Sequence, residues 1–249
     1  MIQRYSANNV REAIVRLTNK PGKKWAYDRP EDEGKPAFER CIENPWTLDK
    51  ISSIDKDLSG TKMFDFGCNK AKYVQAAKKL HNLKTYGIDA KSEGSRYVDH
   101  FFEGQYDSDL ENEIINAGPY AIATSISSVE HAGHDMHPNE IAIRKYQYRI
   151  CKMMIENSEY FFLTVPFGKR PGWAKDESRK NLYQFNSEML DYIKTIAESE
   201  GKNYLEEVYK LEGDKWVISD REAAAGCRYR GSKLGATAIA LISVWSEDE

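Results

Sequence analysis

Two short stretches of this sequence carry residues that could hold a nucleoside-like ligand. Gly67 ends the apolar run 63–66, and Asp89 ends a second run about 20 residues later. A glycine in the first turn lets the backbone approach a ligand closely, and a carboxylate can accept two hydrogen bonds from a vicinal diol. In nucleotide-binding α/β units, this spacing places the acid on ribose hydroxyls. The two stretches therefore predict a pocket for an adenosine-like ligand.

The turn between these stretches contains a single glycine. It reads Asp65-Phe66-Gly67-Cys68-Asn69, whereas a dinucleotide fingerprint contains three glycines. A pyrophosphate lying on the following helix is therefore disfavoured.

A second group of reactive side chains follows the apolar run that begins at Pro119. It consists of Ser127, Ser128, Glu130 and His131. Because an imidazole titrates near neutrality, we expect His131 to be a general base on a substrate hydroxyl, with Glu130 as its acidic neighbour. A histidine hydrogen-bonded within its loop is the structural alternative.

Histidines are concentrated in this region. Three of the five in the chain, His131, His134 and His137, lie within seven residues, with Asp135 between them. Such a cluster could bind a divalent ion that assists the reaction, but the spacing fits no standard ligand pattern. We therefore expect no metal site.

The elements that must position these groups alternate between strands and helices. Strands are predicted at residues 63–66, 85–88, 96–98, 119–128, 160–165, 203–209 and 236–244, with helices after the glycine turn, at about 139–156 and after Asn186. This order predicts a doubly wound, mostly parallel sheet of seven strands flanked by helices. Residues 1–40 are predicted to be a helical extension that could close over the substrate, and 41–249 to form the main domain.

Four motifs, spread over roughly residues 40–245, resemble class I S-adenosylmethionine-dependent methyltransferases. They are Asp65-Phe66-Gly67-Cys68, Gly87-Ile88-Asp89, the segment 124–131, and 162–168 followed by Gln184-Phe185-Asn186. The last is similar to motifs of bacterial surface-glycan and other small-molecule methyltransferases. Asn69 stands where the first motif of that family has its second glycine.

The resemblance implies a Rossmann-like methyltransferase fold with an antiparallel last strand, and S-adenosyl-L-methionine as the cofactor. It also implies an O-methyltransferase, in the biosynthesis of capsule or surface polysaccharide. Asp99, at the end of the run 96–98, would lie near the adenine amino group, and Asp107 competes for that place. The cofactor contacts implied in this way are Asp65, Gly67, Cys68, Asn69, Asp89, Asp99, Ser127 and Ser128.

Bulk composition limits the remaining possibilities. A net charge of −3 over 249 residues argues against general attraction to nucleic acid. The four cysteines form no Cys-x-x-Cys pair, and neither a leader-like start nor a run of 18 apolar residues occurs. We expect a cytoplasmic protein without a membrane span, and the sequence leaves its oligomeric state open.

Basic residues gather in three segments, 20–29, 169–180 and 221–233. We expect these segments to line a site for a small anionic acceptor, such as a phosphorylated or nucleotide-linked sugar. The four contacts favoured are Lys169, Arg170, Arg228 and Arg230. Ordinary solvated loops are the alternative. Two other functions also stay open: an NAD- or nucleotide-sugar-dependent oxidoreductase, and a non-catalytic nucleotide-binding domain.

Overall fold

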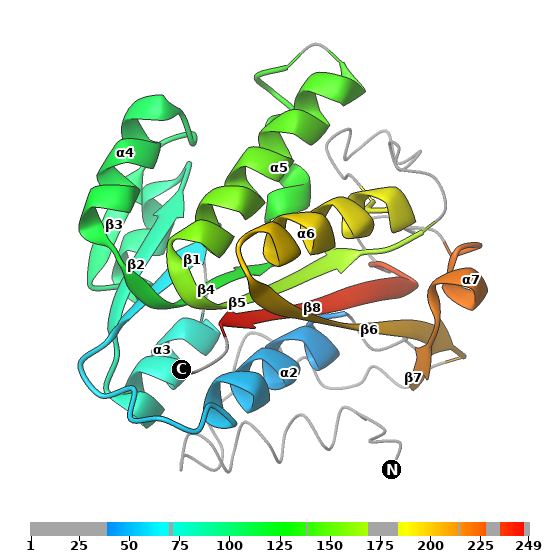
Figure 1. Cartoon of the computed structure of the whole chain (residues 1–249), viewed down its shortest axis with the longest axis horizontal. Coiled ribbons are helices and arrows are strands. Elements are labelled where there is room, and N and C mark those ends of the chain that lie inside the picture. Colours follow the sequence, from blue (N-terminus) through cyan, green and yellow to red (C-terminus); the bar gives the residue numbers. More distant parts are fainter. Residues whose placement is uncertain are drawn as a thin grey trace.

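The computed structural model describes residues 39–69, 72–137, 139–168, 184–213, 215–227 and 235–246. These residues build one eight-stranded sheet in the order β3-β2-β1-β4-β5-β8-β6-β7 (Figure 1). Its strands are β1 (Lys62–Phe66), β2 (Lys84–Asp89), β3 (His100–Glu103), β4 (Tyr120–Ile126), β5 (Ser158–Pro166), β6 (Lys202–Glu212), β7 (Lys215–Ser219) and β8 (Ala238–Ser246).

The first five strands pair in parallel, whereas β8 runs antiparallel to both β5 and β6. The predicted doubly wound, mostly parallel sheet with an antiparallel last strand is therefore confirmed. The sheet has one strand more than predicted, because β7 pairs antiparallel with β6 at the sheet edge.

Helices cover both faces of this sheet (Figure 1). On one face lie α2 (Arg40–Ser52) and α3 (Lys72–His81), and on the other lie α4 (Ser108–Ala117), α5 (Glu140–Glu156) and α6 (Ser187–Ser199). Two short 3-10 helices, η1 (Ser92–Tyr97) and η2 (Val129–His131), and the short α7 (Arg221–Ala224) complete the described elements.

A hydrophobic core lies on each face of the sheet, and neighbouring strand residues alternate between the two. In β1, Met63 packs in the core beneath α2 and α3, while Phe64 packs in the core beneath α5 and α6. All seven residues of β4 are buried, as expected for a strand covered on both faces. The central strands are thus fixed firmly, and their carboxyl ends provide a rigid edge for a site.

Side chains that accept backbone hydrogen bonds define where three helices begin. Asn186 accepts one from Met189 N at 3.1 Å, so the predicted start of α6 is confirmed. Asn139 caps α5 in the same way, and Asp107 caps α4 through Asp109 N and Leu110 N. Each cap satisfies amide groups that have no partner within the helix.

The third strand lies elsewhere than predicted. Residues 96–98, expected to be a strand, belong to η1 and the turn after it, and the strand that pairs with β2 is His100–Glu103. Gly94 explains the helical turn, because a Cβ there would lie 2.9 Å from the Phe101 ring and 3.0 Å from Cys68 Sγ. The chain can pass so close to these side chains only where it has none of its own.

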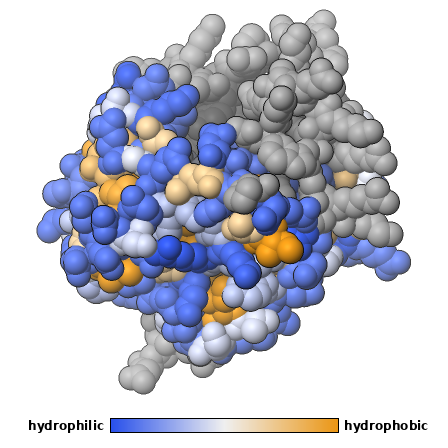
Figure 2. Space-filling model, turned by 90° about the horizontal axis from the view of Figure 1, so that it is seen from above, coloured by the Kyte–Doolittle hydropathy of each residue, from blue (hydrophilic) through white to orange (hydrophobic). Residues whose placement is uncertain are grey.

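The predicted N-terminal extension, residues 1–40, lies outside the described residues except for its last two. Its boundary with the main domain stays a prediction. Within the described ranges, no helix has the length and apolar character needed to cross a bilayer. Figure 2 shows that hydrophilic residues cover most of the described part of the face seen from above.

Candidate active site

A cavity of about 490 Å³ opens at the carboxyl ends of the central strands. Gly67 and Asn69 line it after β1, Asp89 at the end of β2, and Ser128 and His131 after β4. The structure thus brings together residues from the two stretches predicted to hold a nucleoside-like ligand and from the group of reactive side chains near the end of β4. The volume of the cavity suits a nucleoside-sized ligand.

Asp89 is held by the turn it faces. Its Oδ2 accepts a hydrogen bond from Asn69 N at 3.1 Å, and its Oδ1 accepts one from Lys91 N at 2.9 Å. Each carboxylate oxygen can accept a second hydrogen bond. The carboxylate is therefore fixed in orientation and can still accept hydrogen bonds from a ligand diol.

Gly67 is required by its surroundings and by its backbone. Its φ of +81° is a conformation that favours glycine, and a Cβ at this position would lie only 2.4 Å from Ser128 Cβ. The amides of Gly67 and Cys68 both donate to Ile88 O, at 2.9 and 3.0 Å. The turn is therefore joined to the end of β2 and packed against the segment after β4.

Asp65 does not line the cavity. It is buried, and it accepts hydrogen bonds from Tyr73 Oη and, at 2.8 Å, from Thr124 Oγ1. Burial raises the pKa of Asp65 to about 7, against the lowering effect of the two hydrogen bonds. Tyr73 does line the cavity. Asp65 thus contacts a residue of the cavity wall through this phenol.

His131 lines the cavity with its side chain 43% exposed, and Glu130 is fully buried beside it. Glu130 Oε1 lies 3.7 Å from His131 Nε2, and neither oxygen of the Glu130 carboxyl group has a hydrogen-bond partner among the described residues. Burial raises the pKa of Glu130 well above its ordinary value, although the charge of Arg40 opposes this. The pair joins an accessible imidazole to a buried acid.

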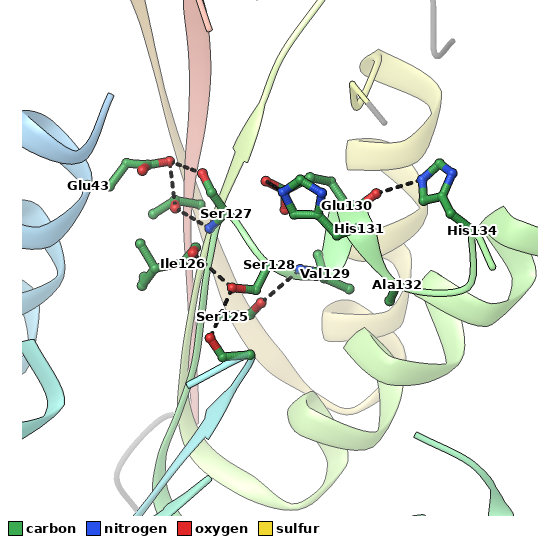
Figure 3. Close-up of polar contacts among 12 residues, drawn as sticks. Glu43, Ser125, Ile126, Ser127, Ser128, Val129, Glu130, His131, Ala132 and His134 are labelled. Carbon is green, nitrogen blue, oxygen red and sulfur yellow. Dashed lines mark hydrogen bonds and ion pairs between the residues drawn. The ribbon is translucent and has the colours of Figure 1, made fainter. Parts of the chain in front are cut away.

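The other two histidines of the cluster have different surroundings, and Figure 3 shows those of His134. His134 Nε2 lies 3.0 Å from Glu130 O, and the His137 ring packs against the Tyr146 ring at 4.9 Å. In the described part of the chain, no three His, Cys, Asp or Glu side chains are grouped so that they could hold a metal ion.

A buried polar group supports the wall after β4. Glu43 Oε1 accepts hydrogen bonds from Ser127 Oγ at 2.5 Å and from Thr164 Oγ1 at 2.9 Å. The other Glu43 oxygen pairs with Arg40, whose second amino group donates to Ser127 O at 3.2 Å. Ser127 and Arg40 both line the cavity.

Three of the expected cofactor contacts, Asp65, Cys68 and Asp99, do not line the cavity. Asp99 accepts hydrogen bonds from Thr85 N at 2.9 Å and from Lys78, beside the start of β2 and thus at the opposite edge of the sheet from Asp89. Asp99 is not among the residues that line the cavity, and neither is Asp107, the cap of α4. Cys68 is buried against Gly87 and Gly94.

Several lining residues were not foreseen from the sequence. Gly104, Gln105 and Tyr106 reach the cavity after β3, and the shifted strand prediction hid them. Arg40, Asn44, Tyr73 and Tyr146 line it from helices. A residue directly after a parallel strand is a general signal for such a position, whereas no local signal distinguishes the helical ones.

The four basic residues predicted to bind the acceptor, Lys169, Arg170, Arg228 and Arg230, lie outside the described residues. Their role stays a prediction.

Comparison with known proteins relates this chain to others through its fold. Neither a protein-family model nor a curated protein sequence matches it. A candidate RNA methyltransferase from Pyrococcus horikoshii is similar over 96% of each chain, with a TM-score of 0.50 and 12% identity. The α/β fold of this chain is therefore one that this candidate methyltransferase shares.

Two further solved structures are similar at lower scores. Precorrin-6y C5,15-methyltransferase from Geobacter metallireducens has a TM-score of 0.45 and 11% identity, over 82% of this chain and 88% of its own. Magnesium protoporphyrin IX methyltransferase from Synechocystis, solved with bound S-adenosylmethionine, has a TM-score of 0.42 and 12% identity, over 94% of this chain and 90% of its own.

Proposed function

We propose that this protein is an S-adenosylmethionine-dependent methyltransferase that methylates an oxygen of a small acceptor. The observation that carries the proposal is the cavity in which Asp89, the Gly67 turn and His131 meet, each from a different strand end. The four sequence motifs and the fold shared with the Pyrococcus horikoshii protein support it.

The residues present fit this cofactor. A Cβ at Gly67 would collide with Ser128, so the glycine keeps the turn open to a ligand. Asp89 retains acceptor capacity for the two ribose hydroxyls, and Gln105 and Tyr106 offer polar and aromatic groups after β3. When bound, S-adenosylmethionine supplies a methyl group on a sulfonium, which is already an activated electrophile.

The protein must then align the acceptor and remove one proton. His131 is the accessible base on the wall after β4, and Glu130 lies 3.7 Å behind its Nε2. A proton gained by the imidazole creates a positive charge, and burial keeps the neighbouring Glu130 in its neutral acid form because it raises the pKa of that group. We assign His131 as the general base and Glu130 as its buried acidic neighbour.

The finer form of the proposal concerns the acceptor. A phosphorylated or nucleotide-linked sugar is favoured by the basic segments of the sequence, and surface-glycan synthesis by the resemblance of the motif at 162–168. Both arguments come from the sequence, and the acceptor must be identified by assay.

Calorimetry and a labelled-methyl assay test the proposal together. We expect S-adenosylhomocysteine to bind to the protein and NAD not to bind, because the turn has one glycine instead of three. Incubation with methyl-labelled S-adenosylmethionine and a panel of neutral and phosphorylated sugars should transfer label to a phosphorylated member. Binding of NAD in place of S-adenosylhomocysteine would favour the oxidoreductase, and cofactor binding with no transfer to any acceptor class would favour a non-catalytic domain.

A further inference from the structure

Ser127 adopts a backbone conformation that is unusual for its residue type. Its φ is +41°, and among the described non-glycine residues only Asn82 also has a positive φ. Asparagine tolerates the left-handed region, whereas serine has no comparable preference for it. Ser127 must therefore be held in place by its surroundings.

Three side chains hold it, and together we call them the Ser127 clamp: Glu43, Thr164 and Arg40. The Ser127 hydroxyl donates to Glu43, its amide lies 3.1 Å from Thr164 Oγ1, and its carbonyl accepts from Arg40. The clamp thus engages the donor and acceptor groups of both the backbone and the side chain of Ser127. Figure 3 shows that Glu43 reaches Ser127 from α2, a different part of the chain from the segment that follows β4.

The unusual conformation has a direct consequence for the cavity wall. β4 ends at Ile126, and the turn at Ser127 brings Ser128 against Gly67, with Ser128 Oγ 3.4 Å from Gly67 O. The chain then enters η2, whose first amide, Val129 N, donates a hydrogen bond to Ser125 Oγ at 3.2 Å. His131 is the last residue of η2, so its position depends on the turn at Ser127.

A clamp of this composition is costly for a purely structural contact. Glu43 is fully buried and is paired with Arg40, whose side chain is 31% exposed at the cavity, and an ion pair with a buried member is often no more stable than well-packed apolar side chains. Buried charges of this kind can instead specify one geometry. Here the geometry specified is that of a cavity wall.

We propose that Glu43 is a positioning residue that holds Ser127 in its left-handed conformation and thereby places His131 at the cavity. The inference rests on the proposed function in one respect, since it takes His131 to be the base. Glu43 itself does not line the cavity.

Nuclear magnetic resonance of histidine-labelled protein tests this without an acceptor. The variants are Ser127→Ala and Glu43→Gln, and His131→Gln assigns the His131 ring signals. Ser158→Ala is the matched control, because Ser158 is as buried as Ser127, at 5% exposure. Its hydroxyl donates a hydrogen bond to Met154 O at the start of β5, at the other end of this strand from the cavity. At one fixed pH, we expect both clamp variants to move the His131 signals and the control to leave them in place.

Two further measurements separate the possible failures. Ser127→Gly tests the conformation itself, because glycine adopts the left-handed conformation without steric cost, and it should move the His131 signals less than Glu43→Gln does. Folded clamp variants whose His131 signals match those of Ser158→Ala would overturn the inference. Calorimetry of the wild-type protein with S-adenosylhomocysteine tests the proposed function separately, and the control Ser158→Ala should retain the wild-type affinity within about threefold.

Discussion

The backbone amide of Asn69 donates a 3.1 Å hydrogen bond to the Asp89 carboxylate and so joins the turn after β1 to the end of β2. The contact fixes the carboxylate beside the one glycine of the turn. Removing it should therefore affect ligand binding more than folding.

For Asp89→Ala, we predict that S-adenosylhomocysteine binds more weakly by roughly 1.5–3 kcal/mol, the range for a hydrogen bond to a charged group. Calorimetry measures the change. Asp99→Ala is the matched control, because Asp99 lies beside the start of β2, at the other end of this strand from Asp89. The affinity of Asp99→Ala for S-adenosylhomocysteine should equal that of the wild type. Equal losses in both variants would refute the assignment of Asp89.

Gly67→Ala should abolish cofactor binding and also destabilise the fold. The new Cβ would lie 2.4 Å from Ser128 Cβ, a contact that only movement of the backbone can relieve. Gly60→Ala provides the control, because Gly60 has a similar φ of +76° but nothing within 4 Å of an added Cβ. Gly60→Ala should cost only the conformational strain, about 1–2 kcal/mol, and should keep full binding.

Urea unfolding measures the loss of stability in Gly67→Ala and in Gly60→Ala. If Gly67→Ala binds S-adenosylhomocysteine as tightly as Gly60→Ala does, the cavity beside Gly67 is not the cofactor site.

The contribution of Asp65 to the stability of the protein should decrease as pH rises from about 4 to 7. Burial raises the pKa of Asp65 to about 7, so in this window the folded state holds a proton that the unfolded state, with an ordinary value of 3.8, has released. Asp65 alone contributes a slope of up to ~1.4 kcal/mol per pH unit. Asp65→Asn should remove that contribution, whereas Asn in place of the exposed Asp55 should leave the slope unchanged. Urea unfolding at several pH values measures this slope of stability against pH. An identical slope in wild type and Asp65→Asn would contradict the prediction.

His131→Ala should lower turnover by about 10²–10⁴-fold with cofactor affinity preserved, the usual effect of losing a general base. The labelled-methyl assay and calorimetry measure the two quantities. A chelator should have no effect, and restoration of activity by added divalent ion after chelation would instead favour a metal-assisted reaction. Full activity of the variant would show that another group removes the proton.

The acceptor prediction can be tested through salt. If basic side chains bind an anionic acceptor, its KM should rise with ionic strength, and Arg170→Ala or Arg228→Ala should raise it further without changing cofactor affinity. Equal turnover of neutral and phosphorylated acceptors by wild type and both variants would leave these residues without a role in binding.

The sequence predicted the central strands well because helices cover both of their faces and each strand is a nearly continuous apolar run. β4 is the clearest case, with every residue buried. The prediction of β3 failed because its residues are exposed or half-buried, so its apolar pattern is weak, while Tyr97 and Val98 imitated a strand.

Sequence reasoning located the site where its residues follow strands directly. Gly67, Asp89, Ser128 and His131 all line the cavity, as such positions predict. The Ser127 clamp could not be found in this way, because Glu43 and Thr164 are 84 and 37 residues from Ser127 and meet it only in the folded chain.

Native mass spectrometry of the freshly purified protein, repeated after addition of S-adenosylhomocysteine, tests the central claim most directly. We predict one S-adenosylmethionine or S-adenosylhomocysteine per chain, either co-purified or taken up on addition, and its loss in Asp89→Ala. A protein that carries NAD, or that stays free of S-adenosylhomocysteine when the ligand is in excess, would contradict the proposal that this is a methyltransferase.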